Sequence, residues 1–222
     1  MVSRIQAGES QRALCREYGI SRWAIQCWLK EPFFPKTRGR KPAEAPAEYK
    51  YENLLNREFH AERPNSKWVT DISYIHTKQG VLYLSIIRDL YDNSIVAYKT
   101  GTEQTVNLVL DTIHMAMHRE KKRVAGKLQL HSDQGFQYTS QAYFNLTKSY
   151  DITPSMSRRS NPYDNAMAEN FFSILKTECI YRHKPASFCE ANEMIDRYIY
   201  FYNHERIQLK TGETPLVRRL ST

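Results

Sequence analysis

An acidic residue lies in a segment that otherwise has the pattern of a β-strand. In the stretch WVTDISYI, Asp71 stands between β-favouring residues such as Val69 and Ile72. A carboxylate in a half-buried strand costs free energy unless something binds it. Asp71 is therefore a candidate for binding a ligand, and the chemistry depends on which other side chains the fold brings to it.

A second acid follows directly on a predicted strand. Asp133 lies in the stretch LQLHSDQGFQYTS, where Gly135 eases the exit from the strand. Functional groups in α/β sheets gather at the ends of strands. Local turn chemistry accounts for this residue as well, because Asp is favoured in turns. The position of Asp133 by itself leaves both interpretations open.

A third acid shares a predicted helix face with a lysine. In NPYDNAMAENFFSILKTECI, Glu169 lies opposite an apolar arc of about 100° that should face the core. Lys176 follows Glu169 by seven residues, which is two helical turns, so the two side chains point the same way. An exposed face with a Glu and a Lys is also common on surface helices. The residues of the apolar arc are Met167, Phe171, Ile174 and Leu175.

Strands and helices are predicted in an order that can position these residues. The strand patterns cover residues 67–75, 81–88, 93–99 and 151–156, and a further short strand ends at KLQLHSD. Helical periodicity covers residues 104–120, 139–149, 163–180 and 187–203. Three strands joined by tight turns come first, and alternating helices and strands follow. This order predicts an α/β domain with a mixed sheet and helices on both faces.

The first 31 residues have the punctuation of two short helices. Ser10 and Ser21 are placed to cap them, and Gly19 supplies the turn between them. This is the pattern of a helix-turn-helix, whose second helix would present Arg22 and Gln26 to a DNA major groove. The alternative is a helical hairpin used for packing or dimerisation. The local positive charge favours DNA binding.

Residues 32–55 are predicted to form a linker rich in proline and basic residues, and residues 56–222 the main domain. Within the linker, Arg38, Arg40 and Lys41 could sit against DNA phosphates. A solvated run of charges is an equal alternative.

Composition indicates an anionic partner. The formal net charge is +8 and the pI is near 9.3. Residues 1–50 hold ten Lys and Arg against five acids, so most of the excess charge is N-terminal. Nucleic acid is the first candidate partner and an anionic membrane surface the second. No apolar stretch approaches the roughly 20 residues that span a bilayer, and no signal peptide is evident, so we expect a cytoplasmic protein.

The cysteines give little indication of a metal or of disulfides. The four of them lack CxxC pairs and are expected to be reduced thiols. Cys179, His183 and Cys189 could be taken as zinc ligands, but three ligands at irregular spacing are a weak signal.

Four stretches of the sequence, in one order, resemble a known protein family. They are WVTDISYI, HSDQGFQYTS, SMSRRSNPYDNAMAENFFSILKTE and YNHERIQLKTGETP. From about residue 56 to about residue 220, the chain resembles the catalytic domain of bacterial transposases of the insertion-sequence-three family, relatives of retroviral integrases. The three catalytic acids of that family, the DDE triad, fall on Asp71, Asp133 and Glu169. The last two are 36 positions apart, leaving 35 residues between them, which is the family's characteristic spacing.

The resemblance implies a ribonuclease-H-like integrase core. In that fold the strand with Asp71 lies beside the strand before Asp133, and a helix brings Glu169 to both. The three carboxylates are then implied to bind Mg²⁺ or Mn²⁺ as two ions, because hard divalent cations take oxygen ligands. The implied activity is metal-dependent cleavage and strand transfer at insertion-sequence ends, by a homo-oligomer on DNA. Lys176 matches the family's basic residue two turns beyond the glutamate and is implied to bind a phosphate of the terminal DNA.

Other polar residues in the motifs are interpreted mainly as structural. Asp89, Asp92 and Asp164 lie in turn-like surroundings, where hydrogen bonds to the backbone account for them. Asn203 and Arg206 match the family's C-terminal YN..R pattern and are interpreted first as structural. Three further residues flank the acids and either orient them, bind DNA or are structural, namely His131, Gln134 and Asn165.

The sequence departs from the family in two ways. Family members place a substantial helical segment before the catalytic core, whereas only the linker and about 15 residues intervene here. The first helix of a three-helix DNA-binding unit also looks cut short at Met1. Both departures predict an internally shortened or fused copy, for which a non-catalytic DNA-binding repressor of transposition is the main alternative. A ribonuclease-H-type nuclease acting on RNA:DNA hybrids fits the fold but not the four motifs.

Overall fold

The computed structural model describes residues 49–120, 124, 127–158 and 162–221, together with Ser10 and Ala13. Apart from those two single positions, the predicted helix-turn-helix lies outside the described residues, as does the linker before residue 49. The same holds for five predicted DNA contacts, which are Arg22, Gln26, Arg38, Arg40 and Lys41.

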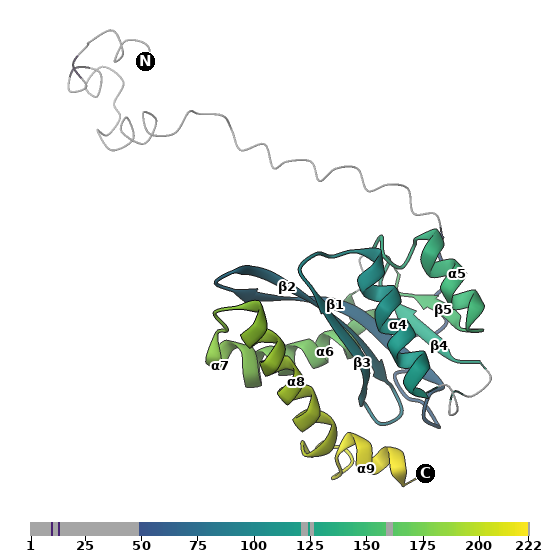
Figure 1. The fold of residues 1–222 in the computed structure, drawn as a ribbon. Helices are drawn as coiled ribbons and strands as arrows, with labels where there is room; N and C mark the ends of the chain where they lie inside the picture. Colours follow the sequence, from purple (N-terminus) through teal and green to yellow (C-terminus); the bar gives the residue numbers. More distant parts are fainter. Residues whose placement is uncertain are drawn as a thin grey trace. The chain divides into compact units, whose positions relative to one another are not determined.

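Five strands form one mixed sheet in the order β3-β2-β1-β4-β5 (Figure 1). β1 and β2 are antiparallel, as are β2 and β3, whereas β4 runs parallel to both β1 and β5. Tight turns join antiparallel neighbours, and parallel neighbours need a crossover, so β4 and β5 are reached through helices. The strands are β1 (Lys67–Thr77), β2 (Gly80–Asp89), β3 (Ile95–Gly101), β4 (Gln129–Ser132) and β5 (Thr153–Met156).

Helices cover both faces of the sheet, which confirms the predicted α/β architecture (Figure 1). On one face lie α4 (Val106–Glu120) and α5 (Gln141–Ser149), and on the other α6 (Ala166–Leu175) and α8 (Phe188–His204). None of the helices in the described part of the chain is long and apolar enough to cross a membrane. The shorter helical elements are the 3₁₀ turn η1 (Pro162–Asn165), the π turn η2 (Lys176–Ile180), α7 (Tyr181–His183) and α9 (Pro215–Leu220).

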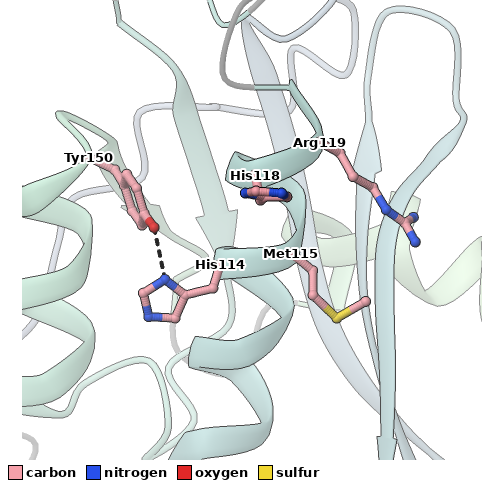
Figure 2. A pocket seen from close by; sticks show the side chains of 5 residues that line it. All are labelled: His114, Met115, His118, Arg119 and Tyr150. Atoms are coloured by element: carbon pink, nitrogen blue, oxygen red, sulfur yellow. Dashed lines mark hydrogen bonds between the residues drawn. The ribbon is translucent and has the colours of Figure 1, made fainter.

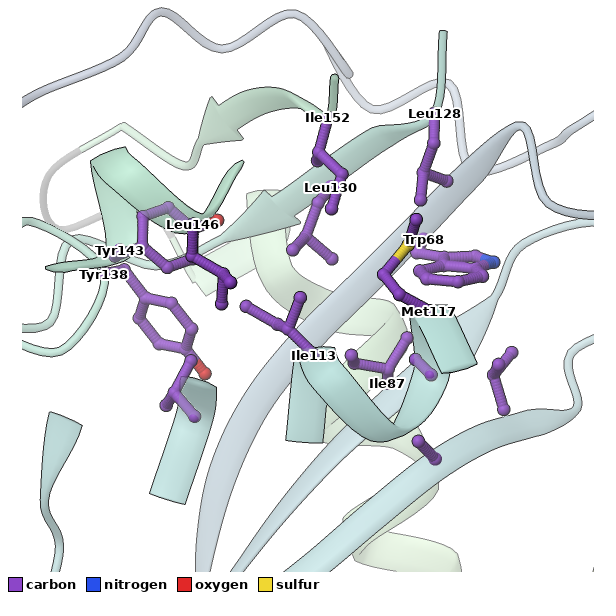
Figure 3. Packing of buried hydrophobic residues seen from close by; sticks show 14 of the residues in the cluster. Trp68, Ile87, Ile113, Met117, Leu128, Leu130, Tyr138, Tyr143, Leu146 and Ile152 are labelled. Atoms are coloured by element: carbon purple, nitrogen blue, oxygen red, sulfur yellow. The ribbon is translucent and has the colours of Figure 1, made fainter. Parts of the chain in front are cut away.

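A separate hydrophobic core lies on each side of the sheet. On the α4 side, Trp68 of β1 and Ile87 of β2 pack with Ile113 of α4 (Figure 3). On the other side, Ile86 of β2 packs in a cluster with Phe171 of α6. Because successive side chains of a strand point to opposite faces, neighbouring residues of β2 serve different cores. The central strands are therefore apolar on both faces and hold the helices in fixed positions.

The structure agrees with the predicted strands to within a few residues and corrects two helical segments. The helix predicted at 163–180 is a helical run of three types, because η1 precedes α6 and η2 follows it. The sequence patterns do not predict α9, since six residues are too few to show a helical period. Two single residues mark the start of this helix, since Thr214 caps it and Pro215 occupies its first turn.

Arg219 of α9 joins the end of β2 to α4. Its guanidinium lies 2.9 Å from a carboxylate oxygen of Asp89, 2.7 Å from one of Asp92 and 3.1 Å from one of Glu120. The Arg219 side chain is 6% exposed, so these ion pairs are shielded from water. Asp89 and Asp92 also accept backbone N–H groups, at 2.9 and 2.7 Å. The interpretation of both acids as structural is therefore confirmed.

Residues 49–55, at the end of the predicted linker, are described and pack onto the domain. Leu55 is 1% exposed. The backbone N–H groups of Leu54 and Leu55 donate to the hydroxyl of Ser155 in β5, at 3.0 and 3.3 Å. The packed domain therefore includes residues before 56.

Candidate active site

Asp71 lies in β1, and Asp133 directly follows β4, the parallel neighbour of β1. In the register of β1 and β4, Val69 is the partner of His131. Each acid follows two residues later in its own segment, Asp71 within β1 and Asp133 directly after the end of β4, and both are partly buried. This confirms the expectation that the strand carrying Asp71 lies beside the strand before Asp133.

The surroundings of Asp71 disfavour the charged form of its carboxyl group. One of its oxygens accepts the N–H of Ile72 at 2.7 Å, and the Asn165 side chain also hydrogen-bonds to it. Burial, and then the charges of Asp133 and Glu169, raise the pKa of Asp71 to about 7 against these two hydrogen bonds. Neighbouring acids disfavour ionisation in this way when no cation compensates them.

Asp133 is held by the turn that follows β4. Its Oδ1 accepts the N–H of Gly135 at 2.9 Å. Burial raises the pKa of Asp133, and the hydrogen bond from Gly135 offsets part of that shift. A Cβ at position 135 would lie 3.0 Å from Asp133 Oδ1 and 3.0 Å from Gln137 Oε1. The missing side chain of Gly135 thus lets the turn close tightly against the carboxylate.

Glu169 and Lys176 both act electrostatically on Asp71 from the α6 side. The charge of Glu169 raises the pKa of Asp71. Burial lowers the pKa of Lys176, and the nearby charge of Asp71 offsets part of that effect. Lys176 is partly buried and opens the π turn η2, a kind of turn that is frequent at functional sites. Asp71 therefore interacts electrostatically with Asp133 after β4 and with Glu169 and Lys176 of the helical run of α6 and η2.

The carboxylates do not form a ready-made metal site. In the described part of the chain, no three acidic, histidine or cysteine side chains are placed to hold a metal ion, and this includes Cys179, His183 and Cys189. The candidate acids nevertheless fit a hard divalent cation, because they supply only oxygen ligands and because the charges of Asp133 and Glu169 raise the pKa of Asp71.

A cluster that sequence reasoning missed fixes the segment before α6. This Asp164 cluster consists of Asn53, Arg57, Arg158 and Asp164. The carboxylate of Asp164 is fully buried and accepts Arg57 Nε at 3.1 Å, Arg158 Nε at 3.0 Å and Asn53 Nδ2 at 2.9 Å. The hydrogen bond from Arg158 is the main cause that holds the pKa of Asp164 well below its usual range. Arg57 lies 107 positions from Asp164, and no local pattern links the two.

The three residues that flank the acids have different roles. The Nδ1 atom of buried His131 shares a hydrogen bond with the hydroxyl of Ser155 at 2.9 Å. The side chain of Gln134 donates to the carbonyl of Ser157 at 3.0 Å. These two contacts brace the loops around the site. Asn165 differs from both because its side chain reaches Asp71.

Asn203 and Arg206 have structural partners, as interpreted from the sequence. The side chain of Asn203 pairs with the backbone N–H and carbonyl of Ile95, at 2.9 and 3.0 Å. Arg206 lies 2.7 Å from a carboxylate oxygen of Glu178. These contacts hold α8 and the segment after it against β3 and η2.

A shallow cavity of about 490 Å³ lies elsewhere, on the outer side of α4 (Figure 2). His114 Nδ1 and the hydroxyl of Tyr150 are 2.8 Å apart at its edge. None of the candidate acids lines this cavity. The lining residues are His114, Met115, His118, Arg119 and Tyr150.

The sequence matches two families that are both described as integrase core domains, at residues 61–162 and at residues 169–219. It is 39% identical over 200 residues to the putative transposase InsK for insertion sequence element IS150 of Escherichia coli strain K12, over 90% of this chain and 68% of that protein. It is 38% identical over 130 residues to the transposase InsF for insertion sequence IS3A of the same strain, over 59% of this chain and 44% of that protein. The chain belongs to the IS3 family of transposases, with an integrase-type core.

The fold of this transposase agrees with its family. It is similar to the structure of the HTLV-2 integrase catalytic core domain in complex with magnesium, with a TM-score of 0.58 and 15% identity, over 72% of this chain and 99% of that chain. The sheet and helices thus form a ribonuclease-H-like integrase core. Family membership assigns the transposase to DNA transposition and to the polynucleotidyl transferases as a class. Asp71 and Asp133 lie in the first matched segment, and Glu169 is the first residue of the second.

Proposed function

We propose that this transposase is a DDE enzyme that cleaves DNA at the ends of an insertion sequence and joins the freed 3′ ends to a target. The observation that carries the proposal is the placement of Asp71 in β1 and of Asp133 directly after β4, the parallel neighbour of β1, with Glu169 near enough to raise the pKa of Asp71. A titratable group whose pKa is raised by burial and by neighbouring charges is a candidate for a functional site.

Asp71, Asp133 and Glu169 are the residues that would hold Mg²⁺ or Mn²⁺, as two ions. When bound, such ions activate the attacking oxygen and stabilise the leaving oxygen of an in-line displacement at phosphorus. Asp71 carries a proton over part of the neutral pH range and gives it up when it serves as a ligand. The side chain of Asn165 orients the Asp71 carboxylate. No covalent intermediate on the protein is required.

Lys176 is proposed to bind a phosphate oxygen of the terminal DNA strand. Its side chain is partly buried and lies in the field of Asp71, so its ammonium group is held near the acids. A lysine ammonium is a compact point charge that suits a phosphate oxygen. Bound there, it would place the scissile phosphate beside the three carboxylates.

Recognition of the DNA ends is proposed for the N-terminal part of the chain. Arg22 and Gln26 would read base edges, whereas Arg38, Arg40 and Lys41 would contact phosphates. The relative from HTLV-2 is described with magnesium and in a trimeric form, which supports a metal-dependent core that associates with copies of itself. We propose that the transposase acts as a homo-oligomer on DNA.

Single substitutions of the three acids test the proposal. Asp71→Asn, Asp133→Asn and Glu169→Gln should each lower Mn²⁺-dependent cleavage and strand transfer by more than about 1,000-fold, because each removes part of one metal site. The matched control is Asp111→Asn, an acid of α4 that is partly exposed and pairs with Lys99. Thermal melting should show that all four variants are folded.

Two results would contradict the proposal. The first is near-normal cleavage by a folded Glu169→Gln variant. The second is a wild-type protein that binds insertion-sequence ends but never cleaves them at any Mg²⁺ or Mn²⁺ concentration. That second outcome would favour a repressor of transposition instead.

A further inference from the structure

Arg88, near the end of β2, is a buried arginine that joins three segments of the chain. It is 4% exposed. Its Nε donates to the carbonyl of Asn93 at 3.3 Å, in the turn after β2. One terminal nitrogen donates to the backbone carbonyl of Met167 in α6, and the other to the hydroxyl of Tyr202 in α8, at 3.1 Å. The guanidinium therefore links the sheet to both helices of one face.

The surroundings of Arg88 are unusual for a buried cation. Within the described residues its hydrogen-bond acceptors are carbonyl and hydroxyl oxygens, and no carboxylate forms an ion pair with it. Arg219 and Arg206, by contrast, each pair with acids. Burial lowers the pKa of Arg88, which reflects the cost of removing its charge from water. A buried charge of this kind contributes little net stability compared with an apolar residue of similar size.

The contact with Met167 acts close to a candidate metal ligand. Met167 lies in the first turn of α6, two residues before Glu169. A hydrogen bond to a backbone carbonyl fixes the helix itself rather than one flexible side chain. Tyr202, the second helical partner of Arg88, packs edge-on against Phe171 of α6 with ring centroids 4.9 Å apart. Two contacts from the same guanidinium therefore restrain the turn that carries Glu169.

The other end of this link is tied to the strand of Asp71. In the antiparallel register Arg88 is the partner of Val69, and Ile86 is the partner of Asp71. β1 and β2 are hydrogen-bonded neighbours in the sheet, so the sheet backbone fixes the position of the Arg88 guanidinium relative to Asp71. The distance between the first and third acids thus depends on the length and geometry of the Arg88 side chain.

We propose that Arg88 is a positioning residue that sets the place of Glu169 relative to Asp71, through its hydrogen bond to the Met167 carbonyl. This inference rests on the proposed role of Glu169 as a metal ligand. Arg88 itself touches neither metal nor DNA. Its contribution is to hold the carboxylates in their places. Residues that hold metal ligands in place in this way alter the metal affinity of a site by about 10-fold or more.

The test compares Arg88→Met, Arg88→Lys and the control Arg197→Met in full-length protein. Arg197 is an exposed residue of α8 with one neighbouring acid, Glu193. Mn²⁺ binding is measured by titration of the DNA-free protein, and folding by thermal melting. Arg88→Met should bind Mn²⁺ about 10-fold more weakly while melting near the wild-type temperature. Arg88→Lys, whose single ammonium group lacks the fork that contacts Met167 and Tyr202 together, should lie between the two, and Arg197→Met should match wild type.

Hydrogen exchange gives a second measurement that does not depend on the metal. The amides of α6 should exchange faster in Arg88→Met than in Arg197→Met, because the first turn has lost its anchor. If Arg88→Met fails to fold, Arg88→Lys carries the same comparison. Wild-type Mn²⁺ affinity and wild-type exchange of α6 in either folded Arg88 variant would overturn the inference.

The same titration separates this inference from the proposed function. A protein whose Mn²⁺ affinity is unchanged by Glu169→Gln has no metal site at the acids, and the proposed function fails with it. A protein that loses affinity with Glu169→Gln but not with Arg88→Met or Arg88→Lys keeps the function and loses only the positioning role.

Discussion

The Asp164 cluster and the carboxyl group of Asp71 show two opposite ways of burying an aspartate in one domain. Asp164 receives two guanidinium groups, an amide and a backbone N–H, and its pKa is held well below the usual range. Asp71 receives hydrogen bonds from Ile72 and Asn165 but faces two further acids, and its pKa is raised to about 7. Asn165, the residue next to Asp164, is the link between these two environments.

The difference indicates which acids are used to stabilise the fold. Arg57 and Arg158 form ion pairs with Asp164, so groups of the protein itself compensate the charge of this carboxylate. Near Asp71 the nearby cation is Lys176, which is not placed in an ion pair within the described residues. A carboxylate whose negative charge is not compensated within the protein can bind a cation. Until a cation binds, the uncompensated charge lowers the stability of the folded state. Three substitutions test this contrast.

The largest expected effect is on stability, at Asp164. Asp164→Asn leaves Arg57 and Arg158 without their carboxylate and should lower the free energy of unfolding by about 3 kcal/mol, the lower end for a buried pair because the arginines are half exposed. Urea unfolding measures the loss, with Asp111→Asn as the surface control, where about 0.5 kcal/mol or less is expected. A fully stable Asp164→Asn protein without cleavage activity would place Asp164 in the catalytic site and break the contrast.

A smaller effect of opposite sign is expected at Asp71. The folded-state pKa is about 7 and the ordinary value 3.8, so the folded state holds the proton more tightly than the unfolded state. Stability therefore falls as pH rises between these two values and is constant above them. Asp71→Asn removes this cost and should stabilise the metal-free protein by about 1 to 2 kcal/mol near pH 8, after allowance for solvent screening, and by less near pH 5.

Melting curves of the metal-free wild type and Asp71→Asn at the two pH values check that prediction. Added Mn²⁺ should stabilise the wild type and not the variant, because the cation replaces the missing positive charge. An Asp71→Asn protein that is less stable than wild type near pH 8 would mean that Asp71 is a satisfied structural acid like Asp164.

The smallest effect is expected at Gly135. A Cβ there would lie 3.0 Å from Asp133 Oδ1 and from Gln137 Oε1, so one of the two side chains must move. Gly135→Ala should weaken Mn²⁺ binding several-fold while changing the free energy of unfolding by less than about 1 kcal/mol. Gly101→Ala at the end of β3 is the control, because its Cβ would meet the flexible end of Leu108 at 3.3 Å. Equal Mn²⁺ affinities in the two variants would show that the turn does not position Asp133.

The sheet and the elements that carry the three acids could be predicted from the sequence because their signals are local. Alternating β-favouring residues indicate the strand of Asp71, and a strand end followed by Gly135 indicates the turn of Asp133. The helical period of α6 separates Glu169 from the core face. The expectation that the three acids form one site rests on the family resemblance and not on any one of these patterns.

The contacts that hold the site in place could not be predicted in this way. Arg57 and Asp164 are 107 positions apart, and Arg88 and Met167 are 79 apart, so only the folded chain brings them together. Arginine in a strand usually faces solvent, so the residue type of Arg88 does not indicate that this side chain is buried. The predicted DNA contacts at Arg22, Gln26, Arg38, Arg40 and Lys41 lie outside the described residues and stay predictions.

The ion pairs of Arg219 also set an order for folding during synthesis. Arg219 lies 130 positions after Asp89 and 127 after Asp92. Until the ribosome has released that part of the chain, the two acids at the end of β2 lack their buried cation. Contacts between such distant residues are slow to form because a long loop must close first. These acids therefore gain their buried cation only when α9 docks, after most of the chain described here has been made.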